Sequence, residues 1–193
     1  MNIQPDKIQQ TKKNLMDAFW RLYETKKIEK ITIKDITEKA GYNRSTFYQY
    51  FKDVYDVLDQ IELALLPDIS KDFLNGSDKF TPDQLVSNIT KTFQRNSKYL
   101  SVLLGDHGDP QFALKMKSII LPIMHQLVAV DFESKHFRYI FEYYFSALIG
   151  VLTYWVNNDK QLSTEELTTL LMEIWSKDVK NLFHTQIETQ KKT

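Results

Sequence analysis

Apolar residues in the first part of the chain recur at the spacing of a one-sided helix. From Asp6 to about Thr25 they fall at intervals of three and four, at Leu15, Ala18, Phe19, Leu22 and Tyr23. Residues three and four positions apart lie on the same side of a helix, so this face can pack on a core. The pattern predicts an amphipathic N-terminal helix.

The stretch from Thr32 to Lys52 has the pattern of two short helices separated by a turn. Thr32 can cap the first helix, because its hydroxyl can accept the backbone N–H of Asp35. Gly41 suits the left-handed conformation in which many helices end, and Asn43 can cap a second helix. Two short helices joined by such a turn are typical of the helix-turn-helix motif, whose second helix enters the major groove of DNA.

Polar, glycine and proline breaks divide the rest of the chain into longer helices. Their predicted bounds are Asp53 to a stop or kink near Pro67, Thr81 to about Leu104, Pro110 to about Val130 with an interruption at Pro122, Ser134 to Val156, and Ser163 to beyond Phe183. The expected interruptions follow from proline, which removes a helix hydrogen bond and clashes with the preceding turn. The last two helices are joined by a short polar loop, so they should be antiparallel neighbours. The sequence therefore predicts an all-α fold of about nine helices.

One segment, Tyr143 to Val156, is apolar enough to require comparison with a membrane span. It has fourteen residues, whereas a helix that crosses a bilayer needs about twenty. A buried helix is the better interpretation, and no membrane partner is expected. The N-terminus lacks the charged start and apolar centre of a secretory signal, which predicts a cytoplasmic protein.

The net charge of the chain is zero, but the charges are unevenly distributed. Residues 7–52 contain eleven lysines and arginines against five acids, a net charge of +6, so the remaining residues carry −6. Such asymmetry suits a basic end that faces phosphate, joined to a region that does not touch DNA. There is no cysteine, which excludes disulfides, thiolate metal sites and cysteine nucleophiles.

The segments T-I-K-D-I at 32–36 and G-Y-N-R-S-T-F-Y-Q-Y-F at 41–51 resemble the tetracycline-repressor (TetR) family of bacterial regulators. The resemblance implies an all-helical homodimer. It further implies a DNA-binding domain at residues 1–52 and a ligand-sensing and dimerisation domain at residues 53–193. The segment Y-Y-F-S-A-L-I-G-V-L-T-Y-W-V at 143–156 also resembles the branch of this family that includes regulators of dihydroxyacetone-kinase genes.

Candidate DNA contacts follow from this resemblance and from side-chain chemistry. The complete expected set is Thr32, Lys34, Asn43, Arg44, Ser45, Thr46, Tyr48, Gln49, Tyr50, Lys52 and Tyr55. The resemblance implies that Thr32 contacts the DNA backbone. It also implies that Tyr48 and Tyr50, at the Y-x-[HY] positions of the family, contact phosphate or a thymine methyl. Residues 44–46 and Gln49 are free to read base edges, where arginine suits guanine and glutamine suits adenine. Phe47 and Phe51, four apart, should share the packed face.

One position departs from the family pattern. Family members usually place a lysine at the start of the fourth helix, and this chain has Val54 there. The corresponding phosphate contact is therefore missing, or it has moved to Lys52 or Tyr55.

Candidates for an effector pocket and a dimer interface come from the C-terminal half. The pocket candidates are Phe93, Tyr99, Met124, His125, Tyr139 and Tyr143, which combine apolar walls with polar tips. The dimer candidates are Ser146, Ala147, Gly150, Tyr154, Leu171 and Trp175; the small residues among them would let another helix approach closely. For any single pocket candidate, a place in the core or the dimer interface remains the more frequent role.

No catalytic, cofactor or metal motif is present in the sequence. The four histidines are scattered, without an HExxH or paired-carboxylate arrangement. We therefore expect no enzyme, no cofactor and no metal. The leading hypothesis is a homodimeric repressor that binds a palindromic double-stranded operator and responds to an unknown small molecule. Two alternatives stay open: an adaptor of the same fold that senses a protein partner, and a small helical enzyme built around His125.

Overall fold

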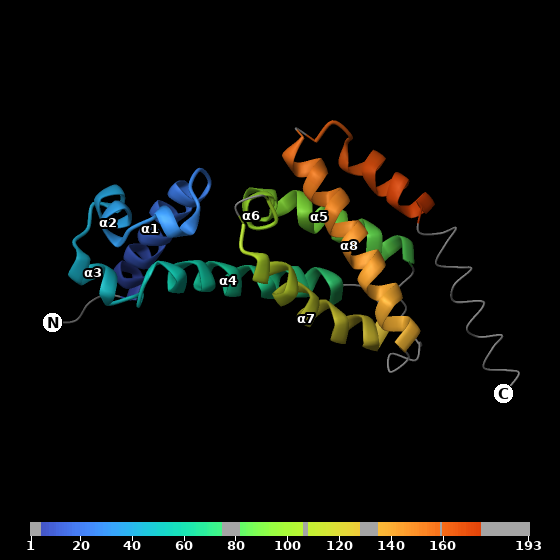
Figure 1. Ribbon diagram of the computed structural model, residues 1–193, viewed down its shortest axis with the longest axis horizontal. Helices are drawn as coiled ribbons and strands as arrows, with labels where there is room; N and C mark the ends of the chain where they lie inside the picture. Colours follow the sequence, from blue (N-terminus) through green and yellow to red (C-terminus); the bar gives the residue numbers. More distant parts are fainter. Residues whose placement is uncertain (1–4, 75–81, 106–107, 128–134, 159, 175–193) are drawn as a thin grey trace, which may run out of the picture. The chain divides into compact units, whose positions relative to one another are not determined.

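The computed structural model describes residues 5–74, 82–105, 108–127, 135–158 and 160–174 (Figure 1). Its elements are α1 (Pro5–Tyr23), η1 (Ile28–Lys30), α2 (Ile33–Ala40), α3 (Arg44–Tyr48), α4 (Val54–Leu74), α5 (Pro82–Arg95), α6 (Ser97–Leu103), α7 (Pro110–Leu127) and α8 (Lys135–Asn157). A further helical segment covers residues 164–174. The described residues contain helices and no strand, which confirms the all-α prediction.

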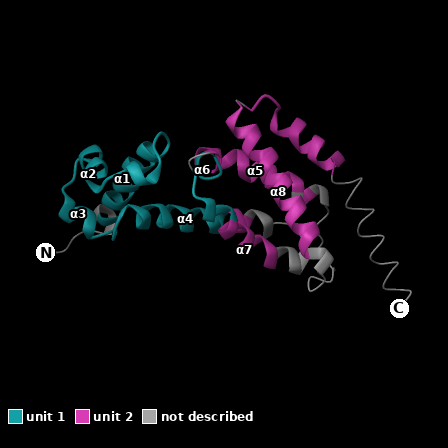
Figure 2. Ribbon diagram, viewed as in Figure 1, with its two compact units in different colours: residues 1–68, 102–113 teal, residues 69–101, 114–193 magenta. Residues whose placement is uncertain are grey.

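Two compact units make up the chain (Figure 2). Unit 1 contains Met1–Asp68 and Val102–Ala113, and unit 2 contains Ile69–Ser101 and Leu114–Thr193. The boundary therefore falls inside α4, and unit 1 includes the junction between α6 and α7 as well as the helix-turn-helix. The functional division between residues 52 and 53 stays a prediction, and these structural units are drawn differently.

The core of unit 1 is built on the apolar face predicted for the first helix. Leu15 and Phe19 of α1 are completely buried, and Ala18 and Tyr23 are nearly so. α1 packs on α2, and α2 packs on α3. Burial raises the pKa of Tyr23 to about 12, and the nearby carboxylates of Asp109, Glu62 and Glu29 add to the shift. The α6–α7 junction, which contributes Asp109, thus lies near α1 within unit 1.

A tight turn shapes this junction. The backbone N–H of Gly108 donates to the carbonyl of Gly105 at 3.0 Å. A Cβ on Gly108 would lie 2.0 Å from the carbonyl oxygen of Leu103, so no other residue fits without movement of the backbone. Asp109 then precedes α7, and its carboxylate accepts the N–H of Gln111 at 2.9 Å. Glycine and the capping aspartate together explain the break predicted at residues 105–110.

Neither α4 nor α7 ends at its proline, so the predicted stop near Pro67 and the predicted interruption at Pro122 are wrong. α4 continues through Pro67 to Leu74, and α7 continues through Pro122 to Leu127. In α4 the proline is exposed, while Leu66 and Ile69 on either side of it are buried. The packed face is thus continuous across the proline, and this packing offsets the missing hydrogen bond.

The single helix predicted from Thr81 to about Leu104 is also wrong, because it divides at Asn96 into α5 and α6. The Asn96 side chain donates to the carbonyl of Thr92 at 3.0 Å. The Asn96 carbonyl accepts the N–H groups of both Tyr99 and Leu100. Asparagine competes for backbone hydrogen bonds in this way and so favours helix ends. Apolar spacing continues across the break, which is why periodicity missed it. Thr81, the predicted first residue of this helix, lies outside the described residues.

Unit 2 contains α8, which packs on α5. The Lys117 ammonium on α7 forms an ion pair with Glu142 of α8 at 2.6 Å and lies 5.3 Å from the centre of the Phe145 ring. After α8 the chain turns back, and residues 164–174 run in the opposite sense in Figure 1. The indole N–H of Trp155 donates to the carbonyl of Leu162 at 2.8 Å across this loop.

The predicted helix start at Ser163 is confirmed, and a capping box forms there. The backbone N–H of Ser163 donates to the Glu166 carboxylate at 2.8 Å, and the N–H of Glu166 donates to the Ser163 hydroxyl at 3.1 Å. These hydrogen bonds hold the pKa of Glu166 below its usual value. The predicted continuation of this helix beyond Phe183 lies outside the described residues.

α8 is not buried on all sides, which corrects the prediction of a buried helix. Phe145, Leu152 and Trp155 are buried, but Tyr139, Tyr143 and Tyr154 are 80%, 67% and 68% exposed. Among the helices that the structure describes, none combines the length and the apolar character needed to cross a bilayer.

Candidate nucleic-acid interface

The two short helices predicted between Thr32 and Lys52 are present with the predicted caps. Thr32 precedes α2 in extended conformation, and Gly41 ends α2 in the left-handed region with a φ of 73°. Asn43 caps α3, and its side chain accepts the N–H of Thr46. The three residues from Gly41 to Asn43 therefore form the turn of a helix-turn-helix.

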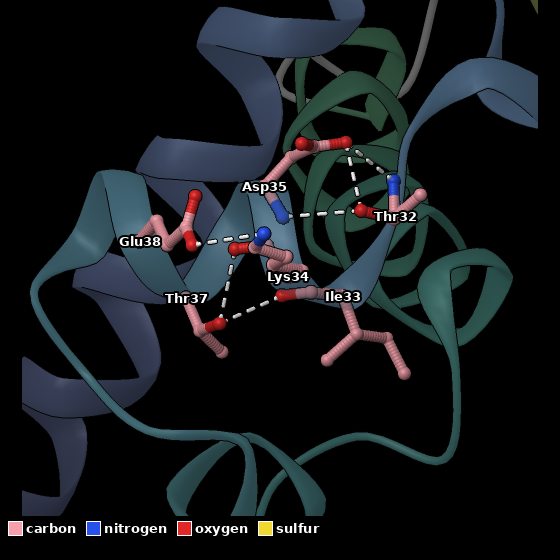
Figure 3. Close-up of polar contacts among 6 residues, drawn as sticks. All are labelled: Thr32, Ile33, Lys34, Asp35, Thr37 and Glu38. Carbon is pink, nitrogen blue, oxygen red and sulfur yellow. Dashed lines mark hydrogen bonds and ion pairs between the residues drawn. The ribbon is translucent and has the colours of Figure 1, made fainter.

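Hydrogen bonds at the start of α2 close a reciprocal capping box (Figure 3). The Asp35 N–H donates to the Thr32 hydroxyl at 3.1 Å, and the Thr32 N–H donates to the Asp35 carboxylate at 3.0 Å. The Thr32 hydroxyl also donates its proton to that carboxylate at 2.8 Å. Hydrogen bonds from the Thr32 side chain and backbone hold the pKa of Asp35 below its usual value.

This network limits what Thr32 can offer to DNA. A hydroxyl has one proton, and here the proton is already donated to Asp35. A phosphate oxygen is an acceptor, so a direct contact from this hydroxyl would require the bond to Asp35 to break. Lys34 stands beside it as an exposed cation, paired with Glu38 at 3.6 Å, and an exposed pair of that kind is readily exchanged for phosphate.

α3 is anchored by one aromatic residue and presents its other side chains outward. Phe47 is completely buried, and its ring lies 5.4 Å from that of Phe51. The two rings share the packed face as predicted, although Phe51 lies beyond the end of this five-residue helix. The exposed expected contacts are Arg44, Ser45, Tyr48 and Gln49, whereas Thr46 and Tyr50 are half-buried.

Asn43 is the centre of a second local network. Its side-chain oxygen accepts the backbone N–H of Thr46 at 2.8 Å. The same oxygen accepts the hydroxyl of Ser45 at 2.7 Å and the hydroxyl of Thr46 at 2.9 Å. Three donors from the first turn of α3 thus converge on one oxygen.

The start of α4 is occupied by carboxylates. Asp53 accepts the N–H of Asp56 at 2.9 Å, and Asp56 accepts the N–H of Lys52 at 2.7 Å. A hydrogen bond from Gln60 lowers the pKa of Asp56, as do the backbone N–H and charge of Lys52. Val54 is buried, so it makes no phosphate contact.

Lys52 and Tyr55, the predicted replacements for the missing lysine, are both exposed beside this helix start. A third candidate, Lys12 of α1, was not predicted. Its ammonium lies 6.0 Å from the centre of the Phe51 ring, and its charge contributes to the lowered pKa of Asp56. The fold therefore brings a cation from α1 to the place where the sequence pattern lacks one.

A hydrogen-bonded chain that the sequence analysis missed connects α1 to the turn. Asn14 donates to the Tyr42 hydroxyl at 3.0 Å, and Gln10 donates to Asn14 at 2.8 Å. The Tyr42 N–H also donates to the carbonyl of Thr37 at 2.9 Å. Two amides spaced four apart on one helix, with a tyrosine in the turn, were the available signal. These hydrogen bonds fix the position of the turn from which α3 starts.

The expected pocket residues differ in how far they are exposed, and their joint role stays a prediction. Phe93 is buried in unit 2 and Tyr99 is half-buried, but Tyr139 and Tyr143 are exposed on α8. The side chains of Met124 and His125 lie outside the described part of the structure.

Most of the expected dimer residues share one face. Ser146, Ala147, Gly150 and Tyr154 are exposed on α8, at helical spacing from Tyr139 and Tyr143. Leu171 is instead buried, and Trp175 lies outside the described residues. Across the described ranges, no three histidine, aspartate or glutamate side chains gather in a way that could hold a metal ion.

Comparisons with known proteins match both parts of the chain. Residues 15–61 match the family described as bacterial regulatory proteins, tetR family, and residues 81–177 match a family described as transcriptional regulator C-terminal region. The chain is 21% identical over 170 residues to an uncharacterised HTH-type transcriptional regulator, YxbF, of Bacillus subtilis. That alignment covers 83% of this chain, which spans 43% of the length of YxbF.

Solved structures share the fold. A TetR transcriptional regulator from Streptococcus agalactiae superimposes with a TM-score of 0.65 at 24% identity, covering 88% of this chain and 95% of that one. The dihydroxyacetone kinase operon activator DhaS superimposes with a TM-score of 0.54 at 17% identity, covering 88% and 96%. At these identities both similarities show a shared fold.

Proposed function

Because the chain belongs to the TetR family of bacterial regulatory proteins, we propose that it is a ligand-responsive repressor that binds a palindromic operator as a homodimer. Its coarser role is that of a DNA-binding transcriptional regulator, not an enzyme. The observation that carries the proposal is α3, where buried Phe47 holds a short helix whose exposed side chains suit base edges and phosphates.

The exposed side chains of α3 have complementary chemistry for reading DNA. Arg44 can donate two parallel hydrogen bonds to guanine, and Gln49 can both donate to and accept from adenine. Tyr48, which is 60% exposed, can contact a phosphate or a thymine methyl. Lys34, Lys52 and Tyr55 would contribute backbone contacts, which set the register and most of the salt dependence.

The dimer interface of this proposal is the exposed face of α8. Tyr139, Tyr143 and Tyr154 frame the small residues Ser146, Ala147 and Gly150. A Cβ on Gly150 would meet no atom within 4 Å, so another helix can approach there. Leu170 and Ile174 add exposed apolar surface on the following segment. We assign Tyr139 and Tyr143 to this interface, and a second copy of the chain is the occupant.

Ligand response would come from unit 2. Its interior is apolar, with Phe93, Leu100, Met116 and Trp155 buried. A small molecule bound there would move α4, which extends into both units. This movement would change the distance between the two DNA-binding heads of the dimer, residues 1–52 of each copy. Such an effector must bind two conformations of the dimer with different affinity, or it shifts nothing. We expect the protein to act in the bacterial cytoplasm, where its operator lies.

Selection of bound DNA from a random pool tests the proposal. A palindromic consensus is expected, with half-sites spaced about 34–36 Å, one helical turn, or a multiple of it. Tyr48→Ala should abolish enrichment while leaving a folded dimer by circular dichroism and sedimentation. Leu63→Ala, an equally exposed residue of α4, is the matched control and should bind normally. Enrichment of no sequence by the unaltered protein would overturn the proposal.

The sign of regulation is tested separately. The structural relative DhaS is named an operon activator, so a reporter gene placed behind the selected operator must distinguish the two outcomes. Repression predicts that the reporter rises when Tyr48→Ala replaces the unaltered protein. A fall in reporter output would instead identify an activator.

A further inference from the structure

We propose that the Ser45 hydroxyl, assisted by that of Thr46, acts only as a hydrogen-bond acceptor and selects a base that presents an amino group in the major groove, adenine or cytosine. The inference rests on the proposed function, because it requires α3 to enter the major groove. It assigns a base preference to one position of the half-site.

The direction of the hydrogen bonds is fixed by chemistry. The Thr46 backbone N–H donates to the side-chain atom of Asn43 at 2.8 Å, so this atom must be the carbonyl oxygen and not the amide nitrogen. A carbonyl oxygen carries no proton. The Ser45 hydroxyl, 2.7 Å away, and the Thr46 hydroxyl, 2.9 Å away, must therefore both be donors to it.

The consequence concerns what these side chains show to DNA. Each hydroxyl has one proton, and both protons are committed to Asn43. Ser45 is exposed, so its remaining lone pairs are available to accept a hydrogen bond from DNA. Thr46 is half-buried and contributes less.

Only two bases offer a donor to such an acceptor in the major groove. Adenine presents its N6 amino group and cytosine its N4 amino group. Guanine presents the acceptors N7 and O6, and thymine presents the acceptor O4 with a methyl group. A guanine or thymine opposite Ser45 would face lone pair to lone pair, unless the hydroxyl turned and left Asn43 with one donor fewer.

Neighbouring residues of α3 thus offer opposite hydrogen-bonding groups to the bases. The Arg44 guanidinium has donors and no acceptor, which suits guanine. Ser45, the next residue, has acceptors and no available proton, which suits adenine or cytosine. Asn43 enforces this difference without touching the base, so it is a positioning residue.

Binding measurements on a half-site series test the inference. Each position of the selected half-site is replaced by all four bases, and the dissociation constant is measured for the unaltered protein and for Ser45→Ala. The unaltered protein should prefer adenine or cytosine at one position by about fivefold, the size expected of one hydrogen bond. Ser45→Ala should reduce the preference at that position to less than about twofold, because its methyl group forms no hydrogen bond with any base.

Two variants of Asn43 separate positioning from a merely structural role. Asn43→Gly removes the oxygen while keeping a tolerated cap, so the freed Ser45 proton should allow guanine or thymine at that position. Asn43→Asp keeps an acceptor oxygen; it should weaken all sequences evenly and retain the base preference. A loss of helix stability alone would weaken every sequence equally and change no preference.

The outcomes distinguish this inference from the proposed function. If the unaltered protein binds a palindrome but Ser45→Ala changes no position, the inference fails and the proposed function stands. If the affected position prefers guanine or thymine, the inference also fails. If the unaltered protein binds no specific sequence, both the proposed function and this inference fail.

Discussion

α3 and α8 are both rich in aromatic residues, yet they use them in opposite ways. α3 buries Phe47 within its own unit, and its polar side chains are organised by Asn43 and the neighbouring turn. α8 is more than four times longer, and it exposes three tyrosines along one face in the single chain. The difference teaches that the side chains of α3 are organised by contacts within their own unit, whereas the exposed face of α8, under the proposed function, would be covered by a second copy of the chain. The variants below test the two halves of this contrast.

Phe47→Ala should have the largest effect. It removes a completely buried ring at the contact of α3 with the core, and such truncations cost about 3–5 kcal/mol. The free energy of unfolding, measured by chemical denaturation followed by circular dichroism, should fall by that amount, and DNA binding should be lost. Leu63→Ala, at an exposed position of α4, is the control and should keep its stability. A stable Phe47→Ala protein that still binds DNA would show that α3 is held from elsewhere.

Gly150→Arg addresses the other half of the contrast. There is open space around Gly150 in the single chain, and glycine is a poor helix former, so the substitution should leave the protomer folded. A dimer would be disrupted, and operator affinity should fall by about a hundredfold or more because the two heads no longer bind together. Sedimentation velocity and gel-shift titration measure both effects. Gln94→Arg, on an exposed position of α5, is the control. If the Gly150→Arg protein still forms a dimer, α8 is not part of the dimer interface.

Lys12→Met should have a smaller effect that is specific to DNA. The methionine keeps an apolar stem against Phe51 but removes the ammonium group. If Lys12 replaces the lysine that Val54 displaced, the slope of log affinity against log salt should decrease by about 0.9, the value for one phosphate contact. Lys27→Met, an exposed lysine before η1, should leave the slope unchanged. A change in melting temperature without a change in slope would limit Lys12 to packing.

Asp56→Asn should have the smallest effect, visible as pH dependence. The folded-state pKa of Asp56 lies below its ordinary value of 3.8, first because of the hydrogen bond from Gln60. A carboxyl group with a lowered pKa stabilises the fold above its unfolded pKa, and this contribution is lost as the pH falls through the folded value. The unaltered protein should therefore lose more thermal stability between pH 6 and about pH 3 than Asp56→Asn does. Glu24→Gln provides an exposed control. Equal losses in all three proteins would mean that Asp56 contributes nothing.

The same contrast explains which features the sequence could predict. Thr32, Gly41 and Asn43 act on backbone groups within three residues of themselves, so their roles follow from local rules and were confirmed. Pro67 and Asn96 were misjudged because their effect depends on packing: the core holds α4 together across Pro67, while Asn96 divides α5 from α6. Lys12 lies close to Phe51 only in the folded protein, because the two residues are far apart in sequence.

Exposure on α8 was beyond sequence reasoning for a different reason. Tyr139 and Tyr143 have the composition of core residues, pocket walls and interfaces alike. Only the fold shows that they lie on the outer face with Ala147 and Gly150, instead of inside unit 2. Their functional assignment still depends on the partner, which is why Gly150→Arg is the more informative test.

The discontinuity of unit 1 has a consequence for synthesis and folding. Its last segment, Val102–Ala113, contains Leu103 and the completely buried Phe112. When a ribosome has delivered only the helix-turn-helix and α4, these apolar side chains are still missing from the unit. Contacts between residues far apart in sequence form late, because a long loop must close first. The DNA-reading head should therefore mature only after more than half of the polypeptide has emerged, and a fragment ending at Asp68 should fold poorly.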